Sequence, residues 1–161
     1  MVDPPTEVPT LLTRRFAAAD PCSPRAVVLE LSLTAQERTR LRGHHRSRCG
    51  RDLILQLPRG GELRAGDWLA DADGDCWVRV CAAAECLLQV TARDPLTLLQ
   101  AAYHLGNRHV PLQISVDRLL LCEDSVLAAM LLARGLELTR VEGPFDPEAG
   151  AYGGKGHGRH P

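Results

Sequence analysis

The chain has 161 residues, 45% of them apolar, which is enough for one ordinary domain or two small ones with a real hydrophobic core. With 19 Lys and Arg against 20 Asp and Glu, the net charge of -1 gives no overall reason to expect nucleic acid or an anionic membrane as partner. No apolar run reaches the roughly 18 residues needed to cross a bilayer, and residues 1–20 contain no signal-type apolar segment. We therefore predict a globular protein of the cytoplasm.

The cysteines give no sign of a zinc knuckle or a redox motif. None of the six forms a C-x-x-C pair, and in the cytoplasm they should be reduced. Cys76 and Cys122 lie inside apolar stretches, so we expect both to be buried as small hydrophobic residues. We assign chemistry to none of them.

The first half of the chain shows the alternation of apolar residues that is typical of strands. Residues 1–10 contain three prolines and few apolar residues, which predicts a flexible arm. Short alternating segments separated by Gly-rich and Asp-rich turns then predict a small all-β domain over residues 11–83. The expected strands are 26–33, the segment around Leu53, Leu55 and Leu57, 67–70 and 76–82.

The pattern changes at about residue 84 to strand, helix, strand, strand, helix, strand. Asp94 caps a helix with Pro95 in its first position, and Gly106 is expected to end that helix. A second helix starts at Asp124 or Ser125 and ends at Gly135. This βαββαβ order over residues 84–142 predicts a ferredoxin-like domain, so the whole chain belongs to the α+β class. The four strands are expected at 87–92, 111–115, 118–121 and 136–141.

The last segment, residues 143–161, contains six Gly and three Pro and almost no apolar residues. Such a segment cannot offset the entropy of ordering itself, so we predict a flexible tail.

The segment Tyr103–Pro111 contains the most informative local pattern. It places His109 between the expected helix stop and a strand, where its imidazole would be exposed. His104 and His109 are five residues apart with a helix end between them, so a chelate like that of H-E-x-x-H is not implied. By spacing alone, each histidine is more often a surface or hydrogen-bonded residue than a metal ligand.

One imidazole cannot satisfy a divalent ion, but a twofold dimer would present His109 twice. Two copies could then meet at the axis and share one ion. Further ligands could come from water or from His157 and His160 in the tail.

The segments Asp94-Pro95 and Ala102–Gln113 resemble the UreE family of urease accessory proteins. Gly143–Tyr152 is similar to the segment before that family's metal-binding tail, and Leu57–Gly60 and Leu63–Asp67 match its N-terminal domain more loosely. The resemblance implies a β-rich partner-binding domain, a dimerising ferredoxin-like domain and a nickel ion held between subunits by His109. It implies a homodimeric nickel metallochaperone whose partners are the urease apoprotein and the other accessory proteins, including the accessory GTPase.

Imidazole ligands suit nickel, and Zn²⁺ or Cu²⁺ are expected as competitors. His157 and His160 are candidate tail ligands, and His104 is a candidate residue behind the metal ligand. Residues 122–125 lack the additional histidines that some members have, and only two tail histidines are present, so we expect one ion per dimer rather than storage of many.

No nucleophile with a base, paired acid and base, or phosphate loop has recognisable spacing, so we do not expect an enzyme. The alternative function is a metal-independent adaptor in the urease maturation complex, which would tolerate loss of His109. The basic stretch 38–51 could be a solvated face, a contact for an acidic partner or, less favourably, a nucleic-acid contact.

Overall fold

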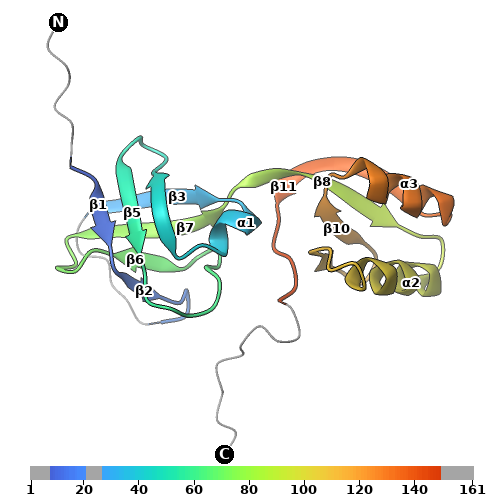
Figure 1. Ribbon diagram of the computed structural model, residues 1–161, viewed down its shortest axis with the longest axis horizontal. Coiled ribbons are helices and arrows are strands. Elements are labelled where there is room, and N and C mark those ends of the chain that lie inside the picture. The colour runs from blue at the N-terminus through green and yellow to red at the C-terminus, as the bar shows by residue number, and fades with distance from the viewer. Residues whose placement is uncertain (1–7, 21–26, 150–161) are drawn as a thin grey trace, which may run out of the picture. The chain divides into compact units, whose positions relative to one another are not determined.

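The computed structural model describes residues 8–20 and 27–149, and the chain divides into two compact units after Ala82 (Figure 1). No helix in the described ranges is long and apolar enough to cross a membrane. The first unit contains β1 (Thr10–Leu12), β2 (Arg14–Phe16), β3 (Val27–Leu33), α1 (Ala35–Arg38), β4 (Arg42–Arg46), β5 (Asp52–Gln56), β6 (Trp68–Ala70) and β7 (Cys76–Ala82). The second contains β8 (Ala84–Thr91), α2 (Pro95–Gly106), β9 (Gln113–Ile114), β10 (Leu119–Cys122), α3 (Ser125–Ala133) and β11 (Glu137–Pro144).

The first unit is built from two small sheets around one aliphatic core. Their strand orders are β1-β5-β4 and β2-β6-β7-β3. Because side chains alternate along a strand, each sheet turns one row of residues inward. Leu12, Leu53 and Leu55 from the first sheet share a buried cluster with Leu69 and Val78 from the second. The predicted β-rich domain is therefore confirmed, although β1, β2 and the single-turn helix α1 carried no clear periodic signal.

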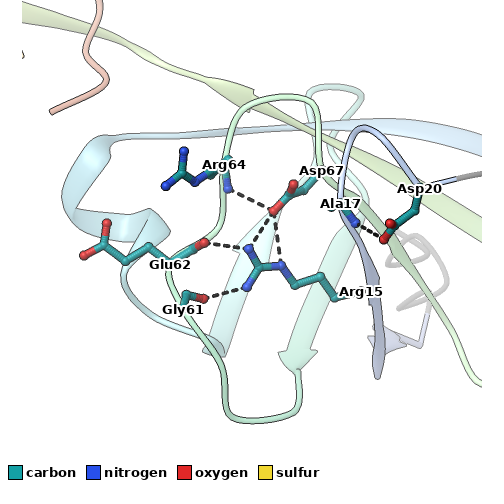
Figure 2. A network of polar contacts seen from close by, with 7 residues as sticks. All are labelled: Arg15, Ala17, Asp20, Gly61, Glu62, Arg64 and Asp67. Carbon is teal, nitrogen blue, oxygen red and sulfur yellow. Dashed lines mark hydrogen bonds and ion pairs between the residues drawn. The ribbon is translucent and has the colours of Figure 1, made fainter. Parts of the chain in front are cut away.

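A buried ion pair attaches the loop before β6 to strand β2 (Figure 2). Arg15 donates from Nε and from a terminal nitrogen to Asp67 Oδ2, at 3.1 and 2.8 Å. Its guanidinium also donates to the carbonyl oxygens of Gly61 and Glu62, both at 2.6 Å. The same Asp67 oxygen accepts the Arg64 N–H at 3.0 Å. Since the Asp67 side chain is only 4% exposed, these bonds replace the water that its charge would otherwise require.

We predict that Arg15→Ala destabilises the first unit by about 3 kcal/mol or more, because it leaves the buried Asp67 carboxylate without its counter-charge. Arg46→Ala is the matched control, since Arg46 also donates from Nε to an aspartate, Asp52, at 3.0 Å. That pair is 70% and 45% exposed, so its loss should change stability far less than the loss of Arg15. Urea unfolding followed by the fluorescence of Trp68 and Trp77 measures both, and equal losses would contradict the assignment.

The second unit has the predicted ferredoxin-like arrangement. Its four antiparallel strands lie in the order β11-β8-β10-β9, and α2 and α3 pack on one face of the sheet. Both predicted helix caps are present. Asp94 accepts from the Thr97 N–H at 2.9 Å, and Asp124 accepts from the N–H groups of Val126 and Leu127 at 2.8 Å.

The segment after Val141 departs from the prediction of a tail that is flexible from Gly143. Strand β11 continues to Pro144 because its pairing with β8 extends that far, and the Phe145 side chain is 1% exposed. Beyond it, the Glu148 N–H donates to the Leu112 carbonyl at 2.7 Å. A single large apolar residue and a few backbone bonds thus hold a segment whose composition alone predicted mobility.

The two cysteines that were expected to be buried differ. Cys76 is buried at the start of β7, which confirms the expectation for that residue. Cys122 is exposed at the end of β10, where its thiol lies 3.8 Å from Glu85 Oε2, so that prediction was wrong. The apolar run Leu119–Leu121 ends one residue before it.

Candidate metal centre

The chain leaves helix α2 through a turn that fixes the position of His109. The His109 N–H donates to the Gly106 carbonyl at 2.9 Å, and the Val110 N–H reaches back to the Leu105 carbonyl at 3.1 Å. These two bonds form a Schellman motif at the C-terminus of the helix. The residue just before the donor of the second bond adopts a left-handed backbone conformation in this motif. That residue is His109, with φ of 57°.

Helix α3 ends in the same turn with a different residue at the left-handed position. The Gly135 N–H donates to the Leu132 carbonyl at 2.9 Å, and the Leu136 N–H donates to the Leu131 carbonyl at 3.2 Å. Gly135 has φ of 79°, and glycine adopts this conformation without a steric penalty. The sequences Leu105-Gly-Asn-Arg-His-Val and Leu131-Leu-Ala-Arg-Gly-Leu therefore align residue for residue, with histidine in place of glycine.

The helix ends predicted at Gly106 and at Gly135 are both confirmed, but of these two glycines only Gly135 takes the left-handed position. Gly106 is the last residue of α2, and Asn107 after it keeps right-handed helical angles (φ -63°, ψ -20°). The left-handed residue comes three positions later. A side chain with a Cβ pays about 1–2 kcal/mol there, so a histidine at this site suggests that its side chain has a function.

His109 is exposed, and no group of other described residues completes a metal site around it. In the described part of the chain, no three His, Cys, Asp or Glu residues lie close enough together to hold an ion. His157 and His160 lie outside the described residues.

His104 is half-buried in the last turn of α2. It lines a shallow surface pocket with Thr97, Gln100 and Arg134, and its ring meets that of Tyr103 at 5.5 Å between centroids. His109 is not part of this pocket, so the structure does not bring the two histidines together in one site.

An apolar stripe lies exposed on α2, the helix that ends at His109. Leu96, Leu99 and Tyr103 are 63%, 67% and 66% exposed. Their spacing of i, i+3 and i+7 places them on one face of the helix. Sequence reasoning did not single out this stripe, although its helical spacing was visible.

The histidine pair in the basic stretch lies on strand β4 and points in two directions. His44 is exposed, whereas His45 is half-buried on the side of its strand partner Leu53. Burial lowers the pKa of His45, and the nearby Glu37 carboxylate partly opposes that effect. Opposite orientations prevent the two side chains from chelating one ion, as the strand geometry predicted.

Comparison with known proteins shows the class to which this two-unit chain belongs. Residues 15–83 match the model of the N-terminal domain of the UreE urease accessory protein, and residues 85–161 match that of its C-terminal domain. A urease accessory protein UreE of Parasynechococcus marenigrum is 52% identical over 154 residues, covering 95% of this chain and 99% of the relative. That of Synechococcus sp. strain CC9311 is 53% identical over 144 residues (89% and 93%), and that of Citrobacter koseri is 46% identical over 138 (86% and 91%).

These matches define a urease maturation factor, an accessory protein rather than an enzyme. The chain belongs to the UreE family.

We predict that His109→Gly is more stable than His109→Ala by about 1 kcal/mol, because glycine relieves the strain of the left-handed position and alanine keeps it. Gly135→Ala should lower stability by a similar amount, because it places a Cβ in the same left-handed conformation. Thermal unfolding of the three variants measures this, and an alanine variant as stable as the glycine variant would show that the position carries no strain.

Proposed function

We propose that this protein is a nickel metallochaperone that delivers Ni²⁺ for assembly of the urease metallocentre, with one ion shared across a homodimer by His109 of each subunit. The observation that carries the proposal is the exposed imidazole of His109 in a backbone conformation that favours glycine. Glycine is the usual residue at this position of a helix end, as at Gly135.

The apolar stripe of Leu96, Leu99 and Tyr103 supports a dimer through α2. Three large side chains that are each about two-thirds exposed on one helix face are typical of a surface that a partner covers. A twofold axis beside this helix would bury both stripes. If that axis runs roughly along the helix, so that the two copies of α2 are parallel, the two α2 C-terminal turns and both His109 side chains would also lie close together.

The backbone bond between Glu148 and Leu112 supports participation of the tail. Leu112 lies three residues after His109, so the bond anchors the last described segment near the candidate site. His157 is nine positions after Glu148, and an extended chain of that length spans up to about 30 Å. His157 and His160 are therefore close enough in sequence to act as additional ligands in our proposal.

A site made of a few imidazoles from two chains suits a carrier that must release its ion. Imidazole binds nickel, and Zn²⁺ and Cu²⁺ would compete, so selectivity would come from metal supply and partner docking more than from the ligands. We propose that the dimer acts in the cytoplasm with the urease apoprotein and the other accessory proteins. Any GTP hydrolysis would be performed by the accessory GTPase.

The test is a calorimetric nickel titration of the wild type, His109→Ala and His109→Gly, with the oligomeric state measured by sedimentation. We expect one tight ion per dimer in the wild type and at least a tenfold weaker affinity in both variants, while the dimer persists. His44→Ala is the matched control and should bind as the wild type does.

A variant of the stripe separates the interface from the ligand. Leu99→Asp should give a monomer that keeps His109 but has lost the tight shared ion. Unchanged tight binding in both His109 variants would contradict the proposed site. Absence of tight nickel binding in the wild type would instead favour the alternative, a metal-independent adaptor.

A further inference from the structure

The outer face of the sheet β2-β6-β7-β3 carries aromatic residues and arginines that the nickel site does not use. Register pairs Phe16 with Trp68 and Trp68 with Arg79 in one row across the strands. A second row runs from Arg14 through Ala70 to Trp77 and on to Val28 in β3. We call these seven residues the aromatic face.

The placement of these aromatics is unusual for the first unit. Its main buried cluster is aliphatic apart from Cys76 and is supplied by residues one position away, such as Leu69, Val78 and Leu29. Trp77 (8% exposed) and Ala70 (0%) are also buried, but outside that cluster, so the accessible members of the aromatic face are the other five. Both tryptophans of the chain therefore lie on the side of the sheet that faces away from the core. Ala70 leaves room between the rows, and Trp77 meets Phe16 at 5.2 Å and Trp68 at 6.4 Å between ring centroids.

Two guanidinium groups cover the aromatic rings. Arg14 stacks over Phe16 at 5.2 Å, and Arg79 stacks over Trp68 at 6.0 Å. Both side chains are exposed, and within residues 8–20 and 27–149 the structure gives neither an ion pair with a carboxylate. The nearest carboxylate in register, Glu30 beside Arg79, is bound to Arg48 at 3.1 Å.

Stacking holds a guanidinium in one plane with its N–H groups free at the edge, which is the geometry that binds a carboxylate through two parallel hydrogen bonds. Trp and Arg are also the residues that contribute most to protein interfaces. Val28, 48% exposed at the end of the second row, adds apolar area. The chain's net charge of -1 argues against nucleic acid as the occupant of such a face.

We propose that the aromatic face is a docking surface for an acidic segment of a protein partner, whose carboxylates bind Arg14 and Arg79 while its apolar side chains contact Trp68 and Val28. This inference rests on the proposed function, since the partner would be a protein of the urease maturation complex. It adds to that function the residues that would bind the partner and the chemistry by which they would recognise it.

The test measures binding of the full-length protein to urease apoprotein in complex with its other accessory proteins. Arg14→Glu/Arg79→Glu should weaken the affinity at least tenfold and reduce its salt dependence. The matched control is Arg40→Glu/Arg42→Glu, which changes the same charge at exposed positions of the basic stretch and should alter affinity less than twofold. The circular dichroism and the urea unfolding of both double variants should match those of the wild type, which shows that the first unit folds, and nickel binding by the second unit should be unchanged.

Two further readouts identify the contact itself. Arg14→Lys/Arg79→Lys keeps the charge but loses the planar stacked group, and it should also weaken binding several-fold. Because Trp68 is partly exposed on this face, the wild-type tryptophan fluorescence should shift when the partner binds.

The docking surface would be overturned if Arg14→Glu/Arg79→Glu bound the complex as tightly as the wild type. It would also be overturned if Arg40→Glu/Arg42→Glu lost as much affinity as that variant. Either result would leave the proposal of a nickel carrier intact. Failure of the wild type to bind the complex at all would overturn the partner role in the proposed function, and this surface with it.

Discussion

The Leu105 carbonyl oxygen accepts the N–H groups of Arg108 and Val110, both at 3.1 Å, and these bonds set the direction in which the chain leaves α2. Leu105 is fully buried, so the turn is fixed to the core of the second unit rather than free at its surface. His109 is consequently held in one backbone conformation with its side chain in solvent. A carrier site needs this combination, because the ligand must be positioned by the fold and remain accessible to a second subunit and to a recipient.

The rest of the second unit supports that turn. The Asp94 cap fixes the start of α2, and its buried residues Leu98, Ala101 and Leu105 pack on the sheet. The helical repeat then leaves Leu96, Leu99 and Tyr103 on the exposed side of the helix. The buried Phe145 and the bond from Glu148 to Leu112 return the chain toward the same end of the unit. The helix that carries the apolar stripe thus ends beside His109, and the chain around Glu148 lies against Leu112 nearby, although the described residues of one chain hold no group of three or more metal ligands.

The sequence predicted what depends on periodicity and local capping. The βαββαβ order, the Asp94 and Asp124 caps and the Gly135 stop all follow from short-range rules, and the structure has each of them. Features that arise from long-range pairing were not predictable. Arg15 and Asp67 are 52 positions apart, and nothing local indicates that they form a buried pair.

The turn at His109 shows a different limit of sequence rules. The rule that a helix ends at glycine selected Gly106, because a histidine in the left-handed position violates the preference on which the rule rests. The family resemblance pointed to the same histidine, while the structure supplied the physical reason to regard it as special. The composition of residues 143–149 likewise predicted a flexible segment, but burial of Phe145 orders it despite the surrounding glycine and proline.

The central claim is that one nickel ion lies between two copies of His109. Diffraction from crystals of the nickel-loaded protein, with anomalous data collected on either side of the nickel absorption edge, locates the ion directly. Our account predicts one anomalous peak on a twofold axis, within coordination distance of His109 from both subunits. A peak bound within a single subunit and remote from His109, for example beside His44, would contradict it.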